Sequence, residues 1–284
     1  MRITIISDIK GNAESIIPYG LNLAKHLEAE VDLVHVIDSR MAQGVSSTYA
    51  DSQSITPGNK FSHAEIMQRE KRQVAMKIDQ MLSKEASKLN YPLKVNVDIE
   101  ENSVENKIAN DLNAGASALM VINKEADGAI FESQKELIDC CKAFSGISLL
   151  VPPGEEFQPI SSILLPTNFD DEEFNNYRKV ADFLGVFHPV VNAMGMRADK
   201  TAGELRQWEK KLSSVFHLSS VNHKLITAGD FEAQFIEYTA LLEPGLTLIF
   251  ERPQNAIASF FKKEFVLKIL EQTRTPVLFY SMKQ

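Results

Sequence analysis

The chain has few of the residues that would hold it together covalently or anchor it in a membrane. Among its 284 residues there are only two cysteines, Cys140 and Cys141, and they are adjacent. A disulfide between neighbouring residues is strained, particularly within a helix, so reduced thiols in a cytoplasmic setting fit best. No stretch approaches the roughly 18 apolar residues of a membrane span, and the N-terminal apolar run is too short for a secretory leader. We therefore expect a cytoplasmic protein.

The cysteine pair leaves two interpretations open. Cys140 and Cys141 are either a vicinal redox switch or a small apolar pair that faces a core. Free cysteine is among the most frequently buried residue types, which favours the second interpretation.

Positive charge is also in deficit. Lysine and arginine number 30 against 38 aspartates and glutamates, which gives a formal net charge of −8. This balance argues against a nucleic-acid partner and against an anionic membrane surface. The hydrophobic content of 44% and the charged content of 24% are those of an ordinary globular protein. The length suffices for one large domain or two of common size.

Motifs for metal binding and for nucleophilic catalysis are missing. The six histidines are scattered, and neither a His-x-x-x-His nor a Cys-x-x-Cys spacing occurs. The Gly-x-Ser-x-Gly elbow of serine hydrolases is absent as well. The sequence therefore predicts no catalytic residue and no metal site, and it favours a non-catalytic protein.

What the chain does contain is a regular alternation of short apolar runs and helical patterns. The runs are continuous and rich in β-branched residues, which is typical of strands covered on both faces in a mainly parallel sheet. A long amphipathic stretch at 63–89 and a helix opened by Ser103 lie between them. The strands expected in the first half are 3–7, 31–38, 93–99, 118–123 and 147–151.

The order of elements then starts again, which indicates an internal duplication. A linker rich in proline and glutamate at 153–159 separates a first domain, 1–152, from a second, 160–284. A new first strand is expected at 162–169, and Ala118–Val151 aligns with Leu246–Phe279 without a gap. A polar insertion at 39–61 occurs in the first half only, and its length and composition favour mobility over an organised functional loop.

These patterns resemble the universal stress protein family, present here as a tandem pair. The strand ends "IISDIKGN" and "LLPTNFDD", the phrase "NLAKHLEAEVDLVHVID" and the later runs "ALMVIN", "LTLIFE", "ISLLVPP" and "TPVLFY" carry the resemblance. It implies an α/β fold of two repeated, doubly wound domains, each a five-stranded parallel sheet flanked by helices, similar to the adenine nucleotide alpha hydrolases. It also implies antiparallel pairing of the two fifth strands as an internal pseudo-dimer. A homodimer and an unidentified protein partner are compatible with it.

The resemblance further implies where a ligand would lie. Members that bind ATP or AMP do so through a glycine-rich loop after strand 4 and an acidic residue at the end of strand 1. In this chain the corresponding first-domain pocket would comprise Asp8, Val36, Asn123 and Gly128. For Asp8 a role as a helix cap is an equal alternative, and Asn168, its counterpart in the second half, keeps only the capping capacity.

The phosphate loop itself has lost most of its glycines. A phosphate requires backbone amides at close approach, which glycine permits, and Gly128 is the single glycine of Val121–Cys141. Carboxylates at Glu125, Asp127 and Glu132 would repel a triphosphate. The second-half loop, 250–265, contains no glycine at all. We therefore expect no cofactor and a stress-response binding or regulatory module, with an ATP/AMP sensor or slow ATPase in the first-domain pocket as the alternative.

Two further features have structural interpretations. Asp170 and Glu173 form a capping-box pattern, and their acidic run is explained by the dipole of the following helix. Trp208, the single tryptophan, is expected to serve packing and not recognition.

Overall fold

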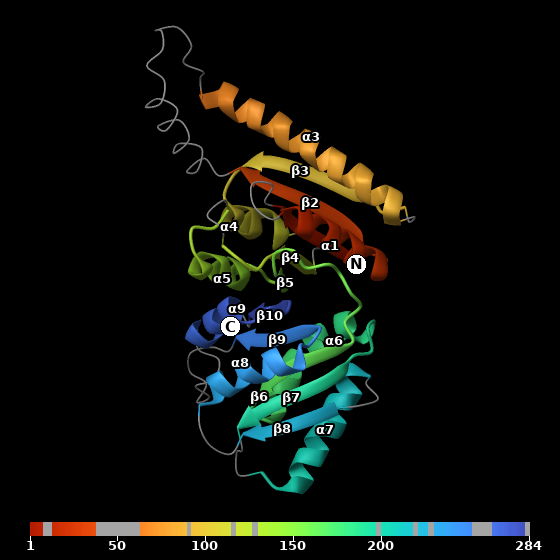
Figure 1. Cartoon of the computed structure of the whole chain (residues 1–284), viewed down its shortest axis with the longest axis vertical. Helices are drawn as coiled ribbons and strands as arrows, with labels where there is room; N and C mark the ends of the chain where they lie inside the picture. The colour runs from red at the N-terminus through yellow and green to blue at the C-terminus, as the bar shows by residue number, and fades with distance from the viewer. Residues whose placement is uncertain are drawn as a thin grey trace. The chain divides into compact units, whose positions relative to one another are not determined.

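The fold was analysed in a computed structural model of the chain (Figure 1). The structure describes residues 1–7, 13–37, 63–89, 92–114, 118–126, 130–196, 200–217, 221–226, 230–251 and 263–281. The insertion at 39–61 lies outside them. The packing divides the chain into two compact units: unit 1 is Met1–Gly146 with Pro153–Phe157, and unit 2 is Ile147–Pro152 with Gln158–Gln284.

Unit 1 is a parallel α/β layer with strand order β3-β2-β1-β4. Its long helix α3 runs along the edge strand β3 (Figure 1). In chain order its elements are β1 (Arg2–Ser7), α1 (Ala13–His26), β2 (Glu30–Ile37), α3 (His63–Leu89), β3 (Val95–Glu101), α4 (Val104–Lys107), the π-helix η1 (Ile108–Leu112), β4 (Leu119–Asn123) and α5 (Gln134–Ala143).

Unit 2 has the strand order β5-β10-β9-β6-β7-β8. All neighbours from β10 to β8 are parallel, whereas β5 pairs antiparallel with β10, with Leu149 opposite Leu278. Its elements are β5 (Ile147–Val151), β6 (Ser162–Thr167), the 3-10 helix η2 (Asp171–Glu173), α6 (Phe174–Gly185), β7 (Val190–Met196), α7 (Ala202–Phe216), β8 (Val221–Ile226), α8 (Phe231–Leu242), β9 (Leu246–Glu251), α9 (Lys263–Gln272) and β10 (Val277–Ser281). The predicted fold class and the antiparallel pairing of the fifth strands are thus confirmed.

The inner strands owe their position to continuous apolar sequence. Every residue of β4 and β5 is buried, and so are the last five residues of β1 and of β6. Consecutive strand residues point to opposite faces, so complete burial means that both faces of the sheet are covered. The edge strands β3 and β8 show mixed exposure instead. None of the helices in the described ranges is long and apolar enough to cross a membrane.

The cysteine pair lies in the core of unit 1, on α5. Neither cysteine forms a disulfide, and both side chains are buried. Burial, together with Cys141 and the nearby Glu105 and Glu136, raises the pKa of the Cys140 thiol well above its ordinary value. A reactive thiol needs the opposite shift, so the structure favours the packing interpretation of the pair.

A buried lysine ties the edge strand β3 to the segment that follows it. Nζ of Lys107 lies 2.6 Å from Asp98, 3.0 Å from Glu100 and 2.8 Å from Asp111, and the lysine side chain is only 8% exposed. Burial lowers the pKa of Lys107, but the carboxylates of Asp111, Asp98 and Glu100 that face the ammonium outweigh this effect and raise the pKa above its ordinary value. The ammonium therefore stays charged at neutral pH and offsets part of the negative charge of three carboxylates.

Replacing this lysine by an uncharged residue of similar length should destabilise unit 1. We expect Lys107→Met to lower the free energy of unfolding by about 2–3 kcal/mol at pH 7, because three carboxylates are left without their counter-charge. The loss is limited because two of these carboxylates, Asp98 and Asp111, are half-exposed to water. Urea denaturation at pH 7 measures this loss.

The matched control is Lys94→Met. Lys94 pairs with Glu30 at 2.7 Å, but both side chains are exposed, so its loss should cost less than about 1 kcal/mol. Equal losses in the two variants would contradict the role assigned to Lys107.

Candidate functional site

The carboxyl ends of β1, β2 and β4 meet at one edge of unit 1. The strand β1 lies between the other two, so Val36 on β2 and Asn123 on β4 flank its end. Both are buried. Nδ1 of His35 lies 2.8 Å from the carbonyl oxygen of Ser7, which requires a proton on Nδ1 and joins the ends of β1 and β2. Of the predicted site residues, Asp8 and Gly128 lie outside the described part of the chain, so their proximity to Val36 and Asn123 stays a prediction.

Asn123 serves the turn that follows its own strand. Its Oδ1 accepts a hydrogen bond from the backbone N–H of Glu125 at 3.0 Å, the contact of an Asx turn. One lone-pair direction of this side chain is therefore committed to the local backbone.

Lys124 is the residue at this edge that the sequence prediction missed. Its side chain is buried, with 2% of the residue exposed, and its carbonyl oxygen accepts from Nε2 of Gln134 at 3.0 Å. Burial lowers the pKa of the amine to about 8, against the opposing field of Glu125. A lysine directly after an apolar strand gives little signal in the sequence, because it is usually solvent-exposed there.

The N-terminus of α5 follows the loop in which a phosphate would bind. Ser133 Oγ accepts from the backbone N–H of Glu136 at 3.2 Å, and the Glu136 carboxylate accepts from the N–H of Glu132 at 2.7 Å. Amides at a helix start are the donors that an anion would need. Here the protein's own hydroxyl and carboxylate take two of them, and the carboxylate also occupies the favourable end of the helix dipole.

In unit 2 the equivalent edge is built around a buried carboxylate. Glu173 accepts from the hydroxyl of Thr167 at 2.6 Å and from the backbone N–H groups of Asn168 and Asp170 at 3.1 and 3.2 Å. The predicted capping box of Asp170 and Glu173 is confirmed, and Glu173 also closes the loop after β6. The predicted cap, Asn168, does not fill this role, and its Nδ2 is buried without an acceptor in the described ranges.

The side chain of Phe169 fills the space at this edge. The residue has φ +60, a conformation uncommon outside glycine and asparagine, and this ends β6 at Thr167 and not at 169 as predicted. Its ring is buried, 5.0 Å from the ring of Trp208 and 6.2 Å from that of His223. Trp208 thus packs in the core as expected, although its Nε1 finds no acceptor among the described residues.

Gly195 on β7 makes room for this ring. A Cβ at that position would lie 2.2 Å from the carbonyl oxygen of Thr167 and 2.5 Å from Cε2 of Phe169. A glycine inside a strand often marks such a close approach, so "NAMGM" held a signal that the sequence reading did not use.

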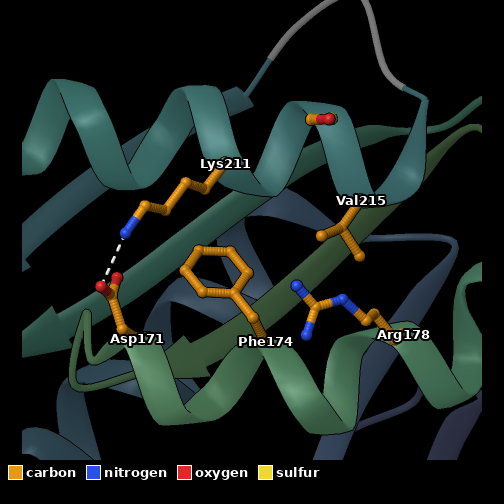
Figure 2. Close-up of a pocket in the computed structure, with 6 residues that line it drawn as sticks. Asp171, Phe174, Arg178, Lys211 and Val215 are labelled. Carbon is orange, nitrogen blue, oxygen red and sulfur yellow. Dashed lines mark hydrogen bonds and ion pairs between the residues drawn. The ribbon is translucent and has the colours of Figure 1, made fainter.

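A separate pocket of about 380 Å³ opens between two helices of unit 2 (Figure 2). Its walls come from η2 and α6 on one side and from α7 on the other. The lining residues are Asp171, Phe174, Arg178, Lys211, Ser214 and Val215. No cluster of histidine, cysteine or acidic side chains suited to a metal ion occurs within the described ranges.

The close approach at Gly195 can be tested by adding one methyl group. Gly195→Ala should lower the free energy of unfolding by about 2–3 kcal/mol, because the new Cβ meets backbone and a buried ring. Gly185→Ala at the end of α6, where a Cβ meets nothing within 4 Å, is the matched control and should cost nothing. Thermal and urea denaturation compare the two, and similar losses would refute the packing described for Phe169.

The fold of this chain is similar to that of several solved structures. No family model and no curated protein matches the chain. Among solved structures, a universal stress protein from Archaeoglobus fulgidus matches with a TM-score of 0.67 at 10% identity, covering 99% of this chain and 98% of that one. Two structures from Pseudomonas aeruginosa each cover 99% of this chain and 92% of their own. One, described as functionally unknown, has a TM-score of 0.55 at 12% identity; the other, a candidate universal stress protein, has 0.54 at 11%.

At these identities the likeness concerns the fold, and it extends over both halves of the chain. The chain therefore has the tandem α/β fold of the universal stress proteins.

Proposed function

We propose that this chain is a non-catalytic binding or regulatory module of the universal stress protein type, that it acts in the cytoplasm, and that it lacks a working ATP phosphate loop. The tandem fold supports the general class. The rest of the proposal depends on what occupies the two edges at which such folds hold ligands.

The observation that carries the proposal is the occupied N-terminus of α5. In a phosphate loop the amides there stay available to the ligand. Here Ser133 and the Glu136 carboxylate accept from two backbone amides, at 3.2 and 2.7 Å. A triphosphate would have to displace a bonded carboxylate and then lie beside its charge, which makes binding unfavourable.

The second edge supports the same conclusion. The ring of Phe169 is buried against Trp208 and above Gly195, where a planar base would otherwise have to fit. Moving the ring out would expose an aromatic side chain to water and open a cavity, which costs several kcal/mol.

Two groups of types that enzymes use in catalysis have structural roles here. The Glu173 carboxylate accepts from Thr167 and from two backbone amides. The Cys140 thiol has its pKa raised by burial, which disfavours the nucleophilic thiolate. These assignments support a module that binds and does not turn over substrate.

One observation favours the alternative, an ATP or AMP sensor or slow ATPase in the first-domain pocket. Lys124 places a buried amine at the carboxyl end of β4. A phosphate near this amine would be attracted to its protonated form and would raise its pKa from about 8. The alternative would use Asp8, Val36, Asn123 and Gly128 around it.

Thermal denaturation separates the two functions. We expect the melting temperature to be unchanged by millimolar ATP or AMP with Mg²⁺, since a ligand that does not bind the native state cannot stabilise it. A nucleotide present at a hundred times its Kd would add about 2.7 kcal/mol.

A rise in melting temperature that is lost in Asp8→Ala would contradict the proposal and establish the nucleotide sensor. Asp79→Ala removes an exposed carboxylate from α3 and controls for the loss of one negative charge. A rise that persists in both variants would locate nucleotide binding elsewhere and would also overturn the proposed function.

A further inference from the structure

We propose that the groove between α6 and α7 is a binding site for a small organic carboxylate with an apolar body, with Arg178 as the residue that recognises its head group. The site lies on the helices of unit 2 and is independent of the nucleotide question, because it uses none of the residues at the strand ends.

The groove is formed by two rows of side chains at helical spacing. Asp171, Phe174 and Arg178 are three and four residues apart along η2 and α6, so they share one face. On α7, Lys211 and Ser214 with the adjacent Val215 form the opposing row. Ser214 is exposed and small, so it leaves space that a larger side chain would fill.

The charges of the groove do not cancel. Nζ of Lys211 lies 2.6 Å from the Asp171 carboxylate, and this hydrogen bond lowers the pKa of Asp171, so the pair stays ionised and neutral overall. Arg178 donates to Oδ1 of Asn175 at 3.1 Å, an uncharged partner. Within the described ranges no carboxylate forms an ion pair with Arg178. The groove thus carries one surplus positive charge on a chain of net charge −8.

Arginine is well suited to bind a carboxylate head group. Its planar guanidinium presents a fork of N–H donors that can bind both oxygens of a carboxylate at once. The single bond to Asn175 leaves further donors of the five available.

The floor of the groove is apolar and rigid. Figure 2 shows the ring of Phe174 between the Lys211–Asp171 pair and Arg178, with Val215 on the facing helix. The Phe174 ring lies 5.6 Å from that of Tyr177 and 5.9 Å from that of Trp208, which hold it in place. Phe174 is only 4% exposed, so an apolar ligand body can contact the edge of its ring and Val215 while its carboxylate reaches Arg178.

The size of the groove limits the ligand. A volume of about 380 Å³ lies at the lower end of the range for small-molecule sites. It accommodates one ring or a short branched chain and is too small for a nucleoside triphosphate. The expected class is an aromatic or branched aliphatic monocarboxylate.

The test uses benzoate as the probe, with benzamide and benzylamine as its neutral and cationic analogues. In NMR titrations of the full chain, benzoate should shift backbone amide signals of α6 and α7, and the two analogues should not. Binding should weaken as salt is raised, because the recognised charge is partly exposed.

Three variants make the test specific. Arg178→Gln should weaken benzoate binding about 10- to 100-fold, the range for loss of a charged hydrogen-bonding partner. Arg206→Gln, which removes an exposed arginine from α7 outside the groove, should leave the affinity unchanged. Ser214→Leu should abolish binding by filling the groove while the melting temperature stays the same or rises.

The proposal is overturned if benzoate causes no shifts at tens of millimolar, if benzamide binds as well as benzoate, or if Arg178→Gln and Arg206→Gln behave alike. Melting temperatures of all variants establish that each is folded. The change in melting temperature with ATP does not depend on whether benzoate binds, so each of the two proposals can fail without the other.

Discussion

Backbone N–H groups just after the carboxyl ends of the strands must find hydrogen-bond acceptors. Much of this structure follows from that requirement. After β4 and β6 these amides are partly buried, where an unpaired N–H is costly. In many α/β proteins a bound anion supplies the missing acceptor. In this chain side chains supply it: Asn123 after β4, the Ser133–Glu136 pair at α5, and Glu173 after β6.

The two repeats have used the same edge differently. In unit 2 the ring of Phe169 fills this edge next to Gly195, and the backbone of Phe169 has the left-handed conformation. Unit 1 places a buried lysine there, whose amine is shifted towards neutrality. The edge of unit 2 is therefore apolar and tightly packed, whereas the edge of unit 1 keeps the ionisable amine of Lys124. Each unit has kept the same strand pattern, because that pattern is fixed by burial on both faces of its sheet.

The sequence was sufficient for the framework because its signals are local. A few neighbouring residues are enough to predict the strands β1, β4, β5 and β6 from their continuous apolar runs. The same holds for the helix start at Ser103. The candidate sites were less predictable because they join residues far apart in the sequence. The ring of Phe169 packs next to Gly195 and Trp208, which are distant from it in the sequence. The groove likewise needs Arg178 and Ser214 on different helices, and burial of Lys124 contradicts what its residue type suggests.

The placement of β5 has a consequence for how such a protein could be divided. The strand β5 pairs with β10, while Pro153–Phe157 belong to unit 1, where Phe157 packs on Tyr19 at 5.5 Å. Neither repeat is therefore a self-contained piece of chain. A polypeptide truncated after the first repeat would carry β5 without its antiparallel partner, and such an unpaired strand edge invites aggregation. If the two repeats were made as separate chains, these chains would have to associate again through β5 and β10.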